Sequence, residues 1–202
     1  MSDFLNIFSA FVFQINLVNG YNYLDNKGRI LSTVFPNDRF VADNQALVIT
    51  DAKGEFTINS KSIIYKINKK IINDYDGNIY NCICTINENF IKKSTEVCKI
   101  IDVQLINRIA CRFIVEFPNL EKEIIRNIFK QEILDSEITA FEQRFTKKGL
   151  IAQYKLAGRN LTIDIDKFIN RDNHNLNKLQ EYFMKILGQF KLKFSSPVDL
   201  VI

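Results

Sequence analysis

Tryptophan is absent from this chain of 202 residues, which has only one histidine, three prolines and seven glycines. Any Ser-His-Asp or Cys-His mechanism would have to use the single histidine, His174. No glycine-rich phosphate-binding loop, metal-binding helix motif or RNA-recognition aromatic motif is present. These absences argue against the common enzyme classes, so we expect a protein without enzymatic activity and without a cofactor.

Long apolar runs are also missing, because no stretch approaches 18 uninterrupted apolar residues. A membrane span is therefore not expected. The apolar segment at 1–18 has no basic leader and includes Gln14 and Asn16, which is typical of a strand and not of a signal peptide. We expect a cytoplasmic protein with no membrane partner.

Cysteines are few and closely spaced, at Cys82, Cys84, Cys98 and Cys111. They lie in apolar stretches, which indicates reduced, buried thiols. A zinc site is the alternative, but it would need a second close pair or a nearby histidine, and neither is present.

The overall composition is typical of an ordered globular protein. Hydrophobic residues make up 47% and charged residues 25% of the chain, which suffices for a sizeable core. The 27 Lys and Arg against 23 Asp and Glu give a net charge of +4, spread along the chain. Such mild basicity does not by itself indicate a nucleic-acid partner.

In the first part of the chain, alternating apolar residues and turn signals predict several strands. The segment 21–43 carries turn signals at 25–28 and 35–38, so we expect short strands and loops there. The remaining strands of this part are expected at 11–18, 46–50, 55–59 and 62–67.

The second part of the chain combines helical spacing with further alternation. We expect His174 in a polar loop before the last helix, which Asn173 or Asn175 opens. The apolar end, 197–202, is expected to dock on the chain's own core, with pairing as an edge strand or insertion into a partner's groove as the alternatives. The predicted helices are 79–99, 120–134 (capped by Asn119) and 176–190, and the predicted strands are 103–117, 138–146, 150–156 and 161–168.

These elements predict the α+β class, with two blocks in which a β-meander is followed by a helix. We expect antiparallel sheets packed with about three helices. The domain prediction is a β-rich N-terminal part, 1–70, and an α+β C-terminal part, 71–202. No flexible linker separates the two parts, so one continuous domain stays open as an alternative.

Arginines in the β-strands provide the first candidate binding site. Arg108 and Arg112 are four residues apart in one predicted strand and therefore share a face, while Arg144 lies in a later strand. Clustered guanidinium groups can bind phosphate or acidic side chains. Ordinary cross-strand pairing with residues such as Glu116 or Glu142 is the alternative.

Two further groups are weaker candidates. Asp164 and Asp166 share a strand face and could bind Mg²⁺ in a phosphoesterase, although a solvent-facing strand is the simpler interpretation and no metal is expected. Lysines could form a basic surface beside tyrosines that stack a base, or simply be solvated. The residues of this surface are Lys66, Lys69, Lys70, Lys92, Lys93, Tyr65 and Tyr75.

The second half of the chain, 106–194, resembles a sporadically distributed bacterial family of uncharacterised proteins. The resemblance rests on the residues 107–109 (Asn-Arg-Ile), the residues 161–166 (Leu-Thr-Ile-Asp-Ile-Asp) and a terminal helix that ends in 190–194. It implies a bacterial or mobile-element origin and carries over no catalytic residue.

From these observations we expect a non-enzymatic protein that binds another protein, in a bacterial or mobile-element defence, counter-defence or immunity role. The alternative is a nucleic-acid or nucleotide-binding module with a basic sheet face. That alternative requires one contiguous positive surface. A homo-oligomer is compatible with either hypothesis.

Overall fold

The computed structural model describes residues 7–18, 23–75, 79–103, 105–120, 140–147 and 149–189. The elements before residue 104 are β1 (Ile7–Leu17), α1 (Tyr23–Val34), β2 (Arg39–Ala42), β3 (Ala46–Thr50), β4 (Gly54–Asn59), β5 (Ser62–Ile67), α2 (Lys69–Asn73) and α3 (Ile79–Ile100). Those after it are β6 (Leu105–Phe117), β7 (Ala140–Lys147), β8 (Leu150–Ala157), β9 (Asn160–Asn175), the 3-10 turn η2 (Leu176–Lys178) and α5 (Leu179–Gln189).

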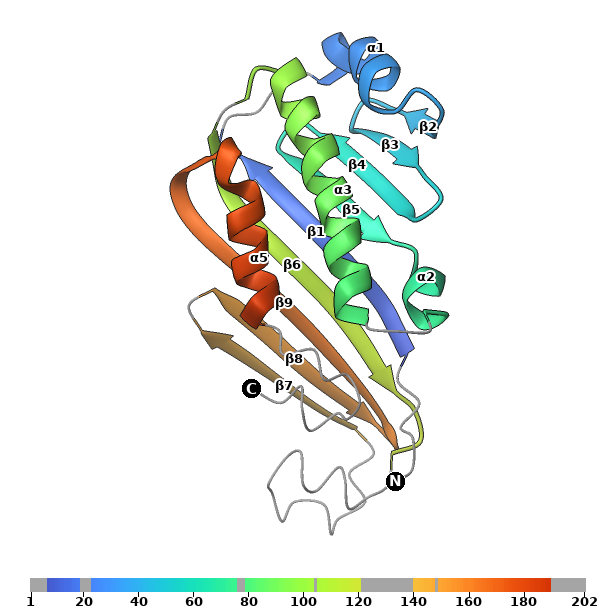
Figure 1. Ribbon diagram of the computed structural model, residues 1–202. Helices are drawn as coiled ribbons and strands as arrows, with labels where there is room; N and C mark the ends of the chain where they lie inside the picture. The colour runs from blue at the N-terminus through green and yellow to red at the C-terminus, as the bar shows by residue number, and fades with distance from the viewer. Residues whose placement is uncertain are drawn as a thin grey trace.

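The nine strands form one antiparallel sheet in the order β2-β3-β4-β5-β1-β6-β9-β8-β7 (Figure 1). The α+β class is therefore confirmed, with a single sheet where the sequence predicted more than one. The strands β1 and β6 are paired at the middle of the sheet. Strand β5, the last of the meander β2–β5, flanks β1, and β9, the last of the meander β7–β9, flanks β6. Each half thus contains a long strand, then a meander, then a long helix. In the first half, α1 lies between the long strand and the meander, and α2 precedes α3.

The pair β1–β6 joins the two halves across about a hundred residues of sequence. Its register places Phe13 opposite Cys111 and Ile15 opposite Ile109. The ranges predicted as two parts, 1–70 and 71–202, therefore share one sheet.

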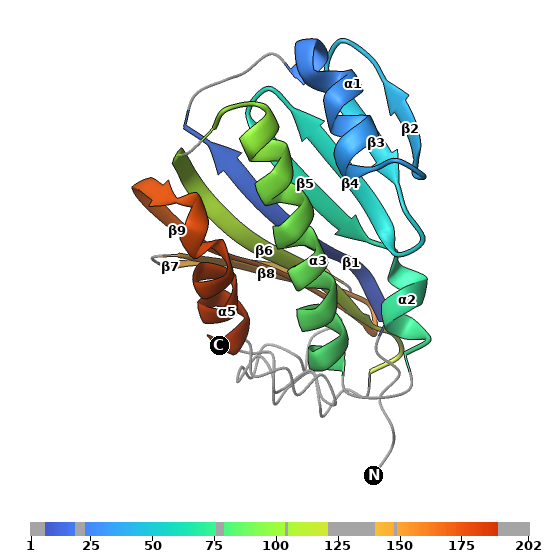
Figure 2. The same ribbon diagram turned by 45° about the horizontal axis from the view of Figure 1, so that its top comes forward.

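Helices α1, α3 and α5 lie over one face of the sheet (Figures 1 and 2). Alternating residues of β1, such as Phe13, face this layer and are fully buried. The ring centroid of Phe13 lies 5.5 Å from that of Phe90 on α3 and 5.8 Å from that of Phe183 on α5. The main core therefore fills the space between the sheet and the helices.

Several predicted elements are confirmed, with ends that shift by up to seven residues, at the end of β9. The strands predicted at 11–18, 46–50, 55–59 and 62–67 correspond to β1, β3, β4 and β5, and that at 103–117 corresponds to β6. The helix predicted at 79–99 is α3, and the strands at 138–146, 150–156 and 161–168 are β7, β8 and β9. Asn175 caps η2, which leads into α5, because its side chain accepts a hydrogen bond from the Asn177 amide.

The prediction of strands and loops for residues 21–43 was wrong over α1. Ile30 on this helix is fully buried, and Leu31 and Val34 pack against the same core. This helical spacing was obscured by the turn-like residues 25–28, which lie in the first half of the helix. Tertiary packing outweighs their weak helix propensity.

His174 does not lie in a loop, because β9 continues to Asn175 and pairs His174 with Ile106. The long partner strand β6 provides the backbone groups that extend β9 to this point. The side chain of His174, the predicted helix at 120–134 and the C-terminal segment 197–202 lie outside the described residues. Among the described residues, no helix is long and apolar enough to cross a membrane.

Candidate functional site

The face of the sheet opposite the helices, called the open face here, carries both arginines of the predicted β6 cluster. Residues of β6 alternate, so Cys111 and Phe113 point towards the helices while Arg112 points away. Arg108 shares this side, and so do Asp164 and Asp166 on the neighbouring strand β9. The arginine candidate and the aspartate candidate therefore form one group.

The four side chains pair as two diagonal salt bridges. Arg112 binds Asp164 with both ends of its guanidinium, because Nε donates to Oδ1 at 3.0 Å and Nη2 donates to Oδ2 at 2.7 Å. Arg108 Nη2 donates to Asp166 Oδ2 at 2.7 Å, and its guanidinium lies 4.5 Å from the centre of the Phe168 ring. We call this group the Arg–Asp ladder.

Charge in the Arg–Asp ladder is compensated internally. The carboxylates of Asp164 and Asp166 are only 21% and 22% exposed, and each faces a guanidinium. Hydrogen bonding to Asp164 raises the pKa of Arg112, which keeps it charged. A metal ion would have to displace an arginine, and a phosphate would have to displace a carboxylate. Among the described residues, no three His, Cys, Asp or Glu side chains cluster as metal ligands.

The other cationic candidates do not gather around the ladder. Arg144 lies on the edge strand β7, two strands beyond β9, and its register partner is Gln153. Lys66 lies on the open face of β5, opposite Val12. Lys69 and Lys70 lie on α2, which follows β5, and all three lysines are exposed.

Lys66 and Lys69 line a hollow of about 410 Å³ at the end of β5. Its wall also includes the acidic residues Asp51 and Glu55, together with Ser9. The hollow is therefore mixed in charge, in contrast to the basic groove expected for a phosphate backbone.

Across the whole open face, cationic and acidic residues nearly balance. The strand registers place six described cationic side chains on this face, namely Arg39, Lys66, Arg108, Arg112, Arg144 and Lys155. They place five acidic side chains beside them, namely Glu55, Glu116, Glu142, Asp164 and Asp166. The net charge of these described strand residues is therefore 6 − 5 = +1, and Asp43, which directly follows β2 and continues its alternation, lowers the sum to 0.

Aliphatic side chains lie between these charges on the open face. Val12 on β1 and Ile64 on β5 are only half-buried, as are Ile114 on β6 and Ile151 on β8. Gln14 and Asn16 continue the row along β1, and the Gln14 amide donates to Asn16 Oδ1 at 2.6 Å. The alternation of β1 in the sequence, like that of β6 and β9, was a signal that could have identified this surface.

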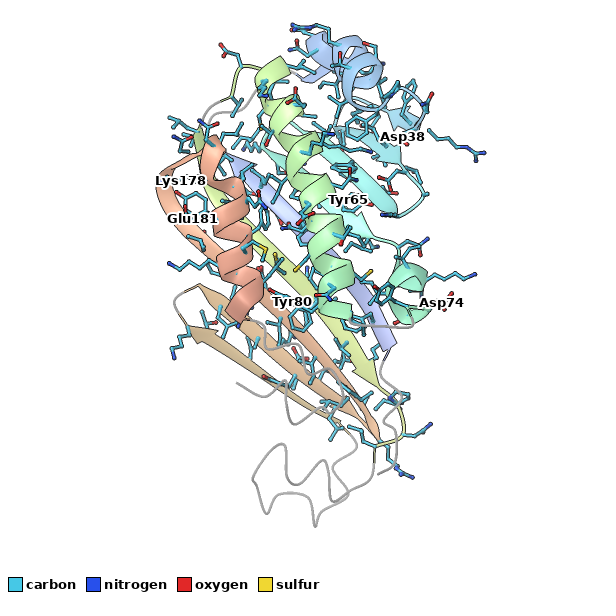
Figure 3. The ribbon with its side chains drawn as sticks, viewed as in Figure 1. Asp38, Tyr65, Asp74, Tyr80, Lys178 and Glu181 are labelled. Atoms are coloured by element: carbon cyan, nitrogen blue, oxygen red, sulfur yellow. The ribbon has the colours of Figure 1, made fainter. Side chains whose placement is uncertain are left out.

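On the helix side, Lys93 belongs to a polar cluster that the sequence did not predict. Its Nζ lies 3.2 Å from Asp38 Oδ2 and 3.4 Å from Asp51 Oδ2, and 4.7 Å from the centre of the Phe35 ring. Tyr65 Oη donates to Asp51 Oδ1 at 2.9 Å. Figure 3 labels Asp38 near β2 and Tyr65 on the sheet behind α3. Lys93 on α3 therefore links this helix, through two salt bridges, to the segments just before β2 and just after β3.

The predicted basic surface with base-stacking tyrosines loses two of its members, Tyr65 and Lys93. Tyr65 is fully buried, and its pKa is raised mainly by burial, so it is not available to stack a base. Lys93 is 19% exposed and does not extend a basic surface with Lys92. Tyr75 is 43% exposed.

The four cysteines are free thiols. Cys98 and Cys111 are fully buried, whereas Cys82 and Cys84 on α3 are half-buried. Burial raises the pKa of all four thiols, which opposes formation of the reactive thiolate.

No protein-family model matches the chain, and no curated protein matches it in sequence. Among solved structures, the chain is similar to "Methanococcus jannaschii TBP", with a TM-score of 0.35 and 7% sequence identity. The alignment covers 91% of this chain and 98% of that chain. At this TM-score the likeness supports no conclusion about fold or function.

Proposed function

We propose that this chain is a non-enzymatic protein-binding module and that the open face of its sheet receives another protein. The observation that carries the proposal is the composition of that face. Half-buried aliphatic residues alternate there with charges that balance one another, and no described helix covers it (Figure 2).

The aliphatic residues supply area that a partner could remove from water. Val12 and Ile64 lie on adjacent strands near the centre of the sheet, and Ile114 lies on the next strand. Burying one such side chain fully is worth about 1.5–3 kcal/mol relative to leaving it exposed, and these residues are already partly covered. The gain from each is therefore smaller, and a stable complex would need several of them.

The charges favour a protein partner over nucleic acid. Binding to a phosphate backbone draws on cations that are free to release counterions. On the open face, Arg108 and Arg112 already pair with Asp166 and Asp164. A mixed surface of this kind can match the mixed charges of another protein surface and set its orientation. A defence or immunity setting for that partner stays a prediction of the sequence.

The proposal is tested by affinity capture of the tagged chain from extracts of the organism that encodes it. Capture is repeated with nuclease, at two salt concentrations, and with the open-face variant Ile64→Glu. We expect a stoichiometric protein that survives nuclease and is lost from Ile64→Glu, because a carboxylate would be desolvated at the centre of the interface.

The matched control is Met184→Glu, which places the same charge on the helix layer at a residue that is 40% exposed. Capture by this variant should equal that of the unmodified chain, and both variants should melt cooperatively. Capture of the same protein by Ile64→Glu would contradict the proposal. So would recovery of nucleic acid that disappears at higher salt, which would favour the alternative instead.

A further inference from the structure

Strand β2 ends the sheet with an edge that the described part of the chain leaves open. It pairs with β3 on one side only, and both ribbon views show no described element beyond it (Figures 1 and 2). Phe40 and Val41 on this strand are 51% and 72% exposed. An open edge with exposed apolar residues is a template for pairing with another strand.

The hydrogen bonds to β3 show which backbone groups of β2 point outward. The Asp43 amide donates to the Ala46 carbonyl at 3.1 Å, so Asp43 belongs to a pair bonded towards β3. In an antiparallel ladder such pairs alternate, and Val41 is therefore also bonded towards β3. Phe40 and Ala42 direct their N–H and C=O groups away from the sheet.

We propose that β2 pairs antiparallel with β2 of a second copy of this chain, around a two-fold axis at Val41. Phe40 then lies opposite the partner's Ala42, and Ala42 lies opposite the partner's Phe40. These two pairs use all the outward groups of both residues and form about four hydrogen bonds. The two Val41 side chains meet at the axis and bury their exposed surface against each other.

Charge complementarity selects this register over its neighbours. Arg39 and Val41 share one side of β2, and Asp43, which directly follows the strand and bonds to Ala46, continues this alternation. The two-fold pairing therefore puts Arg39 opposite the partner's Asp43, and the reverse. Moving the axis to Phe40 or to Ala42 also satisfies the hydrogen-bond pattern, but it places Arg39 opposite Val41 or Gln45 of the partner. The Val41 register alone among the three brings opposite charges together.

Hydrogen bonds from backbone amides favour the charged form of the Asp43 carboxylate. Its carboxylate accepts hydrogen bonds from the amides of Gln45 and Ala46, at 2.7 and 2.8 Å. The bond from Ala46 and then that from Gln45 lower the pKa of Asp43, so the carboxylate persists below neutral pH. Both Arg39 and Asp43 are exposed. The attraction between them should therefore weaken with salt.

The expected dimer is weak, because β2 has only four residues. Such a contact falls below the roughly 1,200 Å² of stable interfaces, so association is expected only at concentrations from about 10 µM to about 1 mM. The inference does not rest on the proposed function, because it uses the edge of the sheet and another copy of the chain.

Sedimentation velocity of the full chain over this range of concentration tests the inference. We expect a monomer that converts to a dimer as concentration rises. Ala42→Pro removes the outward N–H without removing a bond to β3, and proline is tolerated at such edge positions. It should weaken the dimer at least about tenfold while the melting temperature stays within a few degrees.

Arg39→Glu provides a second variant that leaves the backbone intact. The introduced carboxylate faces the partner's Asp43 and should weaken the dimer by about tenfold or more at low salt, whereas Arg29→Glu on exposed α1 should have no effect. Adding Asp43→Asn to Arg39→Glu should restore part of the loss. A monomer at every concentration would overturn the inference, and so would a dimer that none of the β2 variants weakens.

Discussion

Gly54, the first residue of β4, lies where a side chain has no room. A Cβ there would be 2.8 Å from Tyr65 Cζ and 2.9 Å from Tyr65 Oη, and would also press on the carbonyl oxygen of Lys66. The backbone neighbour cannot rotate away, so Gly54→Ala should lower the free energy of unfolding by about 2–3 kcal/mol. Chemical denaturation measures this change.

Gly28 is the matched control, because a Cβ at this position of α1 meets nothing within 4 Å. Gly28→Ala should raise the free energy of unfolding by about 0.5–1 kcal/mol, since alanine is the better helix former. Equal effects from both substitutions would contradict the packing described around Gly54.

Lys93 compensates two shielded carboxylates, Asp38 and Asp51, which are 23% and 11% exposed. Replacing it with methionine keeps most of the unbranched side chain but leaves both acids without their cation. We therefore expect Lys93→Met to destabilise the chain by about 2–3 kcal/mol in denaturant unfolding. Lys92→Met, at the exposed neighbouring position, should change stability by less than about 0.5 kcal/mol.

The Cys98 thiol makes stability depend on pH in the alkaline range. Burial raises its pKa to about 12, whereas a thiol in the unfolded chain titrates near 8.5. Below about pH 8.5 both states carry the proton, and the full stability is present. As pH rises towards 12, the unfolded state loses the proton first, so the free energy of unfolding falls by about 1.4 kcal/mol per pH unit.

Cys98→Ala removes the contribution of this thiol to the pH dependence of stability. Comparison of the variant with the unmodified chain separates that contribution from those of other groups that titrate in the same pH range. The variant should be less stable at neutral pH because it loses core volume, yet its stability should fall less steeply between about pH 9 and 11. Equal slopes for the variant and the unmodified chain would show that the Cys98 thiol is not shielded from water.

At the scale of elements, the Arg–Asp ladder connects β6 and β9 at modest strength. Arg112 is 53% exposed, so its salt bridge with Asp164 is screened by solvent. A double-mutant cycle with Arg112→Met and Asp164→Asn should give a coupling energy of about 0.5–1 kcal/mol that shrinks with added salt. A coupling of zero at low salt would mean that the bidentate pair does not persist in solution.

The elements also show where sequence patterns succeed. Strand β1 was predicted because Phe11, Phe13 and Ile15 alternate with polar or smaller residues, which is a local signal. Helix α1 was missed because its apolar stripe at Ile30 and Val34 is short and follows residues typical of turns. Its stability depends on packing against the core, which a local pattern does not reveal.

At the scale of the whole molecule, the sequence predicted the α+β class but not how the strands combine. The pairing of β1 with β6 joins segments about a hundred residues apart. No local pattern in either segment indicates which strand it pairs with. The same holds for the candidate site. Arg112 and Asp164 were each recognised as candidates, yet their mutual neutralisation depends on β6 and β9 being neighbours.

The open face of this single sheet is the surface that we propose receives another protein. Site-specific photocrosslinking in living cells tests this proposal most directly, with a photoreactive amino acid at position 64 on β5 and, as control, at position 92 on α3. We predict a discrete protein adduct from position 64 and none from position 92. Adducts to nucleic acid from position 64, or the same protein adduct from both positions, would show that the open face is not a specific protein-binding surface.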